Sequence, residues 1–266
     1  MTDLPASVRA ALEESFTPGL PEVEARTPAE DGAEKFLFRL EGGAKVEAVY
    51  LPAPRRRAAS GAGERVTVCV SSQAGCAVNC AFCVTGRLGA GRNLTAGEIL
   101  GQYLAVAREK GFGPRAANVV FMGMGEPLLN VANVVRTLDL LAAEVSPRRT
   151  TLSTAGVVPG IRELARREHR PNLAVSLTAA DDDLRTRLMP INAQWPVAEL
   201  FSALAGWPLE PGRRITFEVV LIAGVNDGPA EARALARLVK RVPSKVNLIP
   251  LNESKEWLPG LARPSG

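Results

Sequence analysis

The sequence predicts an α/β fold, a partial (β/α)6 barrel with a short N-terminal accessory segment that contains a β-hairpin. From residue 66 onward, short apolar runs rich in β-branched residues alternate with amphipathic stretches of helical period, an order typical of parallel strands joined by right-handed crossovers. Six such units suit a curved barrel at this chain length. No G-x-G-x-x-G motif follows the first strand, which argues against an open dinucleotide-binding sheet. We therefore expect an accessory region at 1–65 and a partial barrel at 66–266.

The accessory region is expected to pass from helix to hairpin. Residues 1–30 are polar and interrupted by proline, and they predict a helical segment whose amphipathic part is ASVRAALEESF. Residues 35–51 form two alternating runs joined by Gly42-Gly43, which is typical of a hairpin turn. The stretch APRRRAASGAGER, at 53–65, is rich in Arg, Ala and Gly and predicts a loop.

The barrel region contains six predicted strands with helices between them. The strands are RVTVCVS, ANVVFMG, RRTTLST, NLAVSLT, RITFEVVLI and KVNLIPL. A capping box, Thr95-x-x-Glu98, opens a helix that continues to about Lys110. Later helices are predicted at VANVVRTLDLLAAE, IRELARREHR, PVAELFSALAG and GPAEARALARLVKRV, with DDDLRTRLM after the fourth strand. The single histidine, His169, falls in the predicted helix IRELARREHR.

The composition is that of a globular protein outside the membrane. Hydrophobic residues make up 46% of the chain and charged residues 23%. No apolar run approaches the roughly 18 residues of a membrane span, and MTDLPASVRA lacks the apolar core of a signal peptide. We therefore expect a cytoplasmic protein with reduced cysteines. The net charge of +4 permits a nucleic-acid partner, although clusters such as Arg55-Arg56-Arg57 and Arg148-Arg149 are more typical of solvated surface.

Three of the four cysteines form a C-x3-C-x2-C run in the segment GCAVNCAFCVTG. Cys76, Cys80 and Cys83 stand in one loop after the first strand, where we expect their thiolates to point at a single centre. Three ligands are one short of a closed zinc site and one short of the four that usually hold an iron–sulfur cube, so a cube would keep one iron open. A zinc site with Cys69 as the fourth ligand remains an alternative, and two disulfides are a weaker one.

Polar and glycine residues follow five of the six predicted strands, where the chemistry of α/β barrels is found. Gly125 and Glu126 follow the second strand, and the Glu126 carboxylate can accept hydrogen bonds from an ammonium group. Ser153, Ser176, Leu177, Thr178 and Asn252 stand at the ends of later strands. Each alone is typical of a cap or a turn. Their convergence at one end of a sheet that also carries the cysteines favours a functional site.

These motifs together resemble the RlmN/Cfr family of radical S-adenosylmethionine (SAM) methyltransferases. The resemblance covers residues 1–262 in family order and rests on CVSSQAGCAVNCAFCVTG, NVVFMGMGEPLLN, RRTTLSTAGVVPGI, MPIN, FEVVLIAGVND and KVNLIPLN. It implies a radical SAM barrel that methylates adenine in 23S rRNA and, for RlmN, in tRNA. The commoner C2-directed RlmN branch is favoured over the C8-directed Cfr branch. An electron donor such as flavodoxin, no membrane partner and a monomeric state are also expected.

The resemblance implies a role for each candidate residue. Cys76, Cys80 and Cys83 would ligate a 4Fe–4S cluster whose open iron binds SAM. The SAM-contacting positions would be Gly125, Glu126, Ser153, Ser176, Leu177, Thr178 and Asn252. Glu47 matches the residue that accepts the ring proton, and Cys69 matches the partner of the methyl-carrying cysteine.

Two departures from the family pattern bear on activity. Thr178 stands where the family usually has histidine, and no ACGQL-like segment with a methyl-carrying cysteine follows Asn252. We therefore expect a chain of these 266 residues to bind the cluster and SAM but to be deficient in methyl transfer. It is then a truncated piece of an ordinary enzyme, a naturally short member, or a non-catalytic iron–sulfur RNA-binding module.

Overall fold

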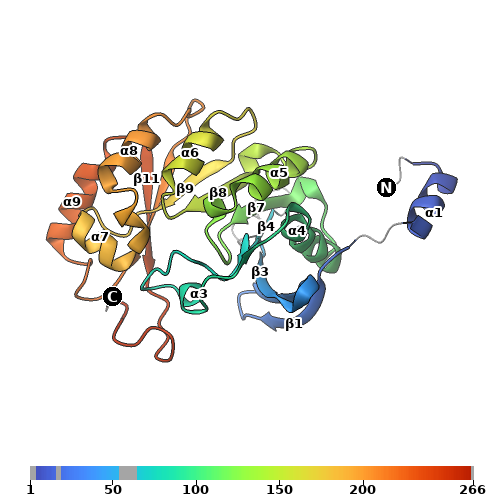
Figure 1. Cartoon of the computed structure of the whole chain (residues 1–266), viewed down its shortest axis with the longest axis horizontal. Coiled ribbons are helices and arrows are strands. Elements are labelled where there is room, and N and C mark those ends of the chain that lie inside the picture. The colour runs from blue at the N-terminus through green and yellow to red at the C-terminus, as the bar shows by residue number, and fades with distance from the viewer. Residues whose placement is uncertain (1–3, 16–18, 54–64, 265–266) are drawn as a thin grey trace.

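The computed structural model describes residues 4–15, 19–53 and 65–264, and one nine-stranded sheet forms its centre. Six parallel strands follow one another across this sheet in the order of the sequence, as predicted (Figure 1). They are β4 (Val66–Cys69), β7 (Ala117–Phe121), β8 (Thr150–Thr154), β9 (Asn172–Ser176), β10 (Ile215–Leu221) and β11 (Ser244–Pro250). Because β1 and β11 lie at opposite edges, the described sheet is open, as a partial barrel requires.

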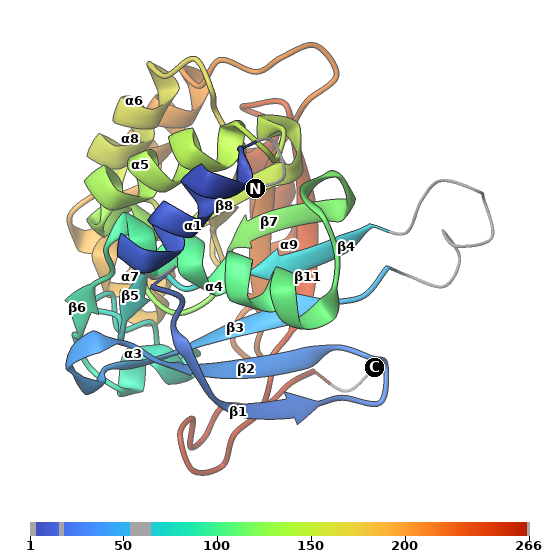
Figure 2. The same cartoon turned by 90° about the vertical axis from the view of Figure 1, so that its right-hand side faces the viewer.

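Three antiparallel strands extend the sheet beyond β4 (Figure 2). The predicted hairpin is confirmed: β2 (Glu34–Arg39) and β3 (Lys45–Leu51) pair around a turn, η1 (Glu41–Gly43), in which Gly42 and Gly43 both have positive φ. Strand β3 then pairs with β4, so that the hairpin and the parallel strands share one sheet. The boundary between 1–65 and 66–266 crosses this sheet and stays a prediction.

The prediction of a helical segment over residues 1–30 is only partly right. Helix α1 (Ala6–Ser15) is present, but strand β1 (Glu22–Pro28) replaces the second part and pairs antiparallel with β2. Five of the seven β1 residues are exposed, since β1 is an edge strand held by backbone pairing rather than by an apolar pattern of its own. The predicted loop at 53–65 falls almost wholly on 54–64, outside the described residues.

The helices that follow the parallel strands form an arc beside the sheet in Figure 1. They are α4 (Ala96–Lys110), α5 (Val131–Ala142), α6 (Val158–Ala165), α7 (Asp182–Leu188), α8 (Val197–Ala205) and α9 (Pro229–Val239). The capping box of α4 is confirmed, because Thr95 and Glu98 exchange side chain–backbone hydrogen bonds. Helix α6 ends at Ala165, so the prediction of a helical His169 is wrong; helix α6 is one turn shorter because its chain turns at Arg166. No helix in the described part of the chain is both long and apolar enough to cross a membrane.

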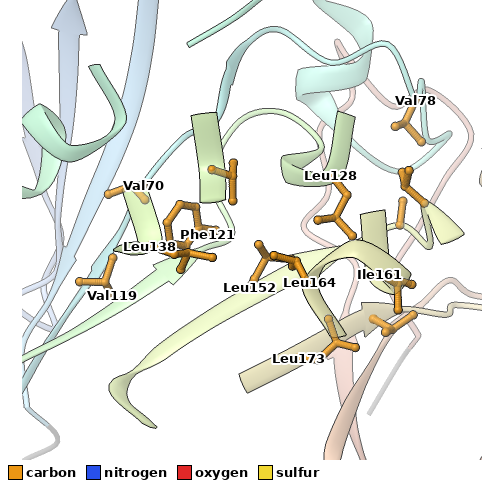
Figure 3. Packing of buried hydrophobic residues seen from close by; sticks show 14 of the residues in the cluster. Val70, Val78, Val119, Phe121, Leu128, Leu138, Leu152, Ile161, Leu164 and Leu173 are labelled. Atoms are coloured by element: carbon orange, nitrogen blue, oxygen red, sulfur yellow. The ribbon is translucent and has the colours of Figure 1, made fainter. Parts of the chain in front are cut away.

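The core lies between one face of strands β4 and β7 to β10 and helices α4 to α8, whereas β11 is largely exposed and α9 has no buried residue. Alternate strand residues such as Phe121, Leu152 and Leu173 are buried against helical residues such as Leu138 and Leu164 (Figure 3). Val78, from the cysteine segment, belongs to the same buried cluster and lies at its end in Figure 3. The core therefore fixes one face of the sheet and leaves the other for polar side chains.

Candidate functional site

The face of the sheet opposite the core is polar and carries several of the predicted site residues. Register places Cys69 beside Val120, and it places Ser176 beside Glu218 and then Asn247. Ser153 lies on the same face because it aligns with Ala174, two residues before Ser176. A cavity of about 560 Å³ opens on this face, and Met122, Thr151, Thr216, Glu218, Lys245 and Asn247 are among its lining residues.

The cysteine segment is a closed loop held by a short ribbon that sequence reasoning missed. Strands β5 (Gln73–Ala74) and β6 (Arg92–Asn93) pair antiparallel at its base. A Cβ on Gly91 would lie 1.2 Å from the Ala74 carbonyl oxygen, so only glycine allows this approach. The Cys76 N–H donates to the Gly89 carbonyl at 2.9 Å across the loop. Two-residue strands are too short to show a period of two, and this is why the pattern gave no signal.

The three cysteines of the loop are half-buried and influence one another electrostatically. Burial raises the pKa of Cys80 to about 12, and the negative charges of Cys83, Cys76 and Glu126 add to this shift. Burial likewise raises the pKa of Cys76, against hydrogen bonds from the Val78 and Asn79 backbone N–H groups to its sulfur. All four cysteines of the chain are free thiols.

The expectation that the three thiolates point at a single centre is not confirmed. In residues 4–15, 19–53 and 65–264, no three His, Cys, Asp or Glu side chains are gathered closely enough to hold a metal ion. Burial and mutual repulsion both disfavour thiolates, so the loop supplies no force of its own that draws the sulfurs together. What the structure brings together is the loop, the Glu126 carboxylate and, on the side of Cys80, the Arg185 guanidinium.

Glu126 is a buried carboxylate that links the end of β7 to the end of β8. Its Oε1 accepts hydrogen bonds from the Leu128 N–H at 3.0 Å and from the Thr154 hydroxyl at 2.7 Å. Its Oε2 accepts one from the Ala155 N–H at 2.6 Å. Burial raises the pKa of Glu126, and these three donors oppose that shift. Because a carboxylate has about four acceptor sites, Oε2 retains one for a further donor.

The glycines before Glu126 contact the chain itself. A Cβ on Gly123 would lie 2.7 Å from Ser71 Oγ, and one on Gly125, which has φ 96°, would lie 2.5 Å from Gln73 Cβ. The Glu126 N–H donates to the Gln73 side-chain oxygen at 2.7 Å. Gly123 and Gly125 therefore let the β7 end pack on the segment that leads from β4 into the cysteine loop.

Thr178 has two unusual features at the end of β9. It is one of two non-glycine residues with positive φ among the described residues, at 56°, a conformation that is strained for a β-branched side chain. Its hydroxyl is buried and has no hydrogen-bond partner in the described part of the chain. Its carbonyl oxygen accepts a hydrogen bond from the Asn226 side chain at 2.9 Å. A buried hydroxyl without a partner is uncommon in folded proteins and calls for an explanation.

Glu47 and Cys69 share the polar face across neighbouring strands. Val49 pairs with Cys69, and Glu47 lies two residues from Val49 on the same side of β3. The Glu47 carboxylate is part-exposed and forms an ion pair with Lys35 at 2.8 Å. Burial raises the pKa of Cys69 to about 11, so its sulfur is a neutral thiol near pH 7.

Asn252 is the predicted site residue that the structure does not bring together with the others. It is exposed in the loop after β11 and makes no side-chain hydrogen bond within the described residues.

Arg185 is a buried charged residue that sequence reasoning missed. Its side chain is fully buried, and it bonds the carboxyl ends of β8 and β9. The available signal was its place in α7: Arg185 precedes Leu188 by three residues, on the face where an amphipathic helix carries apolar side chains.

Comparison with known proteins gives a consistent family. A model of the Radical SAM superfamily matches residues 70–237. The "Dual-specificity RNA methyltransferase RlmN" of an Anaeromyxobacter species is 47% identical over 272 residues, which cover 98% of this chain and 68% of that protein. The "Probable dual-specificity RNA methyltransferase RlmN" of Thermus thermophilus is 44% identical, over 95% of this chain and 70% of the relative. This chain thus spans about two thirds of the length of these curated relatives.

Solved structures agree with these relatives. A radical SAM methyltransferase from Sphaerobacter thermophilus matches with a TM-score of 0.85 and 43% identity, over 99% of this chain and 76% of that one. Streptococcus suis SuiB bound to S-adenosylmethionine matches 74% of this chain and 43% of its own, with a TM-score of 0.51. At 12% identity, the likeness to SuiB concerns the fold alone.

Proposed function

Because this chain belongs to the radical SAM superfamily and, within it, to the RlmN family, we propose that it forms the 4Fe–4S and SAM site of an enzyme that methylates C2 of adenine in 23S rRNA and tRNA. The observation that carries the proposal is the closed loop of Cys76, Cys80 and Cys83, which lies beside the buried Glu126 carboxylate. Three cysteines in a protein of this family are the ligands expected of a cluster with one open iron.

The donor and acceptor set around the loop is compatible with both cofactors. Cys76, Cys80 and Cys83 would hold the cluster, since thiolates are the ligands of iron–sulfur clusters and a bound iron lowers the pKa of a thiol. The free acceptor site on Glu126 Oε2 would receive the ammonium group of SAM, and the orphaned Thr178 hydroxyl would form a further polar contact. The same end of the sheet is bordered by Ser153, Ser176, Leu177 and the Gly125 backbone. Asn252 would have to move toward this end to contact SAM.

The cluster, when bound, supplies the electron that cleaves SAM reductively. The chain binds and orients SAM along the ends of β7, β8 and β9, and the apolar core behind those strands keeps water from one side of the site. Glu47 is the proton acceptor in this proposal: its part-exposed carboxylate shares a face with Cys69, and Lys35 holds it there. Cys69 is protonated near pH 7 and would act as a thiol partner rather than as a free thiolate.

The proposal extends to the surroundings of the enzyme. A net charge of +4 favours approach to the RNA backbone. Reduced cysteine ligands require a reducing compartment, so the cytoplasm is the expected location and flavodoxin the class of electron donor. A monomer is the expected state.

The Glu47→Gln variant tests both the role of Glu47 as proton acceptor and the proposed methylation of adenine. The neutral amide of the variant cannot accept a proton, so in an enzyme that joins this chain to a methyl-carrying cysteine we expect formation of 2-methyladenosine in a 23S rRNA fragment or tRNA to fall by about 10²- to 10⁴-fold. Iron content and cleavage of SAM should stay unchanged, because Glu47 touches neither cofactor in this proposal. The measurement is mass spectrometry of digested RNA against 2-methyl- and 8-methyladenosine standards. The 8-methyl product would overturn the C2 assignment, and methylated RNA formed by residues 1–266 alone would overturn the expected deficiency in methyl transfer.

A further inference from the structure

Arg185 is a fully buried cation whose hydrogen-bond partners are all neutral. Its guanidinium donates to the carbonyl oxygens of Ala155 at 2.7 Å, Ser176 at 3.1 Å and Leu177 at 3.2 Å. It also donates to Asn192 Oδ1 at 2.7 Å. The side chain therefore joins α7 to the ends of β8 and β9, where we place the SAM contacts.

No carboxylate pairs with this charge. Arg185 forms no ion pair in the described part of the chain, and burial lowers the pKa of its guanidinium to about 10, which still leaves it charged near pH 7. Asp182 lies in the same helix, but its Oδ1 is engaged by Asn192 Nδ2 and the Val197 N–H. A buried charge without a counter-charge is costly, so an anion is expected close by.

Arg185 lies on the side of the cysteine loop that carries Cys80, near enough for their charges to interact. The two segments are also joined directly, because the Ala81 N–H donates to the Leu188 carbonyl at 2.8 Å. Helix α7 thus holds its buried cation against the loop at the middle of the three cysteines.

We propose that Arg185 is the buried counter-charge of the iron–sulfur cluster held by the cysteine loop, and that its charge raises the cluster's reduction potential. The inference rests on the proposed function, since it requires a cluster at Cys76, Cys80 and Cys83. Reduction adds one electron, and hence one negative charge, to a group already bound by thiolates. A fixed positive charge nearby stabilises the reduced form, because net charge and exposure set the potential of such clusters. Arg185 is a positioning and tuning residue, and it does not touch the substrate.

Arg185→Met tests the inference by an electrochemical measurement that does not depend on turnover. Cluster-loaded protein is titrated with dithionite, and the reduced cluster is counted by electron paramagnetic resonance at each potential. We expect Arg185→Met to shift the reduction equilibrium about tenfold toward the oxidised form, or about 59 mV for a one-electron couple. Arg187→Met is the matched control, because Arg187 is exposed on the same helix, and its potential should equal that of the unaltered chain.

Each outcome of the titration bears on one claim. A fully loaded Arg185→Met protein with an unchanged potential would overturn the inference and leave the proposed function intact. An unaltered chain that takes up no cluster would overturn the proposed function instead. Loss of the cluster from Arg185→Met, with an unchanged unfolding midpoint of the cluster-free form, would support the inference, because a merely structural residue would lower that midpoint.

Arg185→Lys decides the matter if Arg185→Met does not fold. Lysine keeps the charge but loses the fork that bonds several acceptors at once. We expect Arg185→Lys to be less stable yet to load a full cluster. Its reduction equilibrium should lie within about threefold of that of the unaltered chain. A tenfold shift in Arg185→Lys, or failure to load, would show that hydrogen bonding rather than charge matters and would overturn the inference.

Discussion

The residues at the ends of β8 and β9 form two contrasting hydroxyl sites. Thr154 is buried and satisfied: it donates to Glu126 Oε1 and accepts from the Gly156 N–H at 3.0 Å. Thr178 is equally buried, but its hydroxyl has no partner among the described residues. A buried hydroxyl without a partner calls for an explanation, and a contact with SAM is the one that we propose for Thr178. The inferred SAM contact therefore depends on the difference between the unpaired hydroxyl of Thr178 and the fully bonded hydroxyl of Thr154.

Thr178→Val tests that difference. Valine has nearly the same shape and the same strained backbone, so removal of the unpaired hydroxyl should leave the free energy of unfolding unchanged or raise it by up to about 1 kcal/mol. The affinity for SAM should fall about tenfold, as measured by equilibrium binding to the cluster-loaded protein. Thr154→Val is the control, and we expect it to destabilise the chain by about 1–3 kcal/mol, because it leaves buried partners unsatisfied. Unchanged SAM affinity in Thr178→Val would refute the ligand contact.

At the scale of elements, the cysteine loop depends on glycines rather than on the cysteines alone. The β5–β6 ribbon closes the loop only because Gly75 and Gly91 let its two arms approach each other. The buried side chain of Val78 anchors the part of the loop between Cys76 and Cys80 in the core. The base of the loop is therefore set by contacts within the chain itself, and a single methyl group there should disturb it.

Gly91→Ala introduces that methyl group. Its Cβ would overlap the Ala74 carbonyl, so the ribbon has to open, and we expect a loss of about 1–3 kcal/mol in unfolding free energy. Iron uptake during anaerobic reconstitution should fall with it. Gly113→Ala is the matched control, since a Cβ there meets no atom within 4 Å, and it should behave as the unaltered chain. Normal iron uptake by a stable Gly91→Ala protein would show that the ribbon does not control the loop.

The elements differ in how well the sequence predicts them, and the reason is physical. All six parallel strands were predictable, because each is a short apolar run followed by glycine or polar residues, although β11 itself is largely exposed. Strand β1 was not, because pairing with β2 rather than apolar alternation holds it. Arg185 was not either, because its burial depends on acceptors that other segments supply: Asn192, Ser176 and, 30 residues away, Ala155. The position of a charge in a fold is a tertiary property, whereas a C-x3-C-x2-C run is local.

At the scale of the whole molecule, the two faces of the sheet differ in character. One face and its helices form the apolar core, and the opposite face presents Glu47, Cys69, Ser153 and Ser176. The cysteine loop and Glu126 close the carboxyl ends of the strands, and α7 brings Arg185 to the same place. The family match over residues 70–237 and the structural likeness over 99% of the chain agree with the fold that underlies this arrangement.

The most direct test of the proposed radical SAM site is the reductive cleavage of SAM by the reconstituted chain. After anaerobic loading we expect about four iron atoms per chain and, with dithionite and SAM, formation of 5′-deoxyadenosine and methionine. Cys80→Ala should lose both the cluster and the cleavage, whereas Cys69→Ala should keep both. A full 4Fe–4S complement that yields no 5′-deoxyadenosine would contradict the central claim that this loop and the strand ends beside it form a radical SAM site.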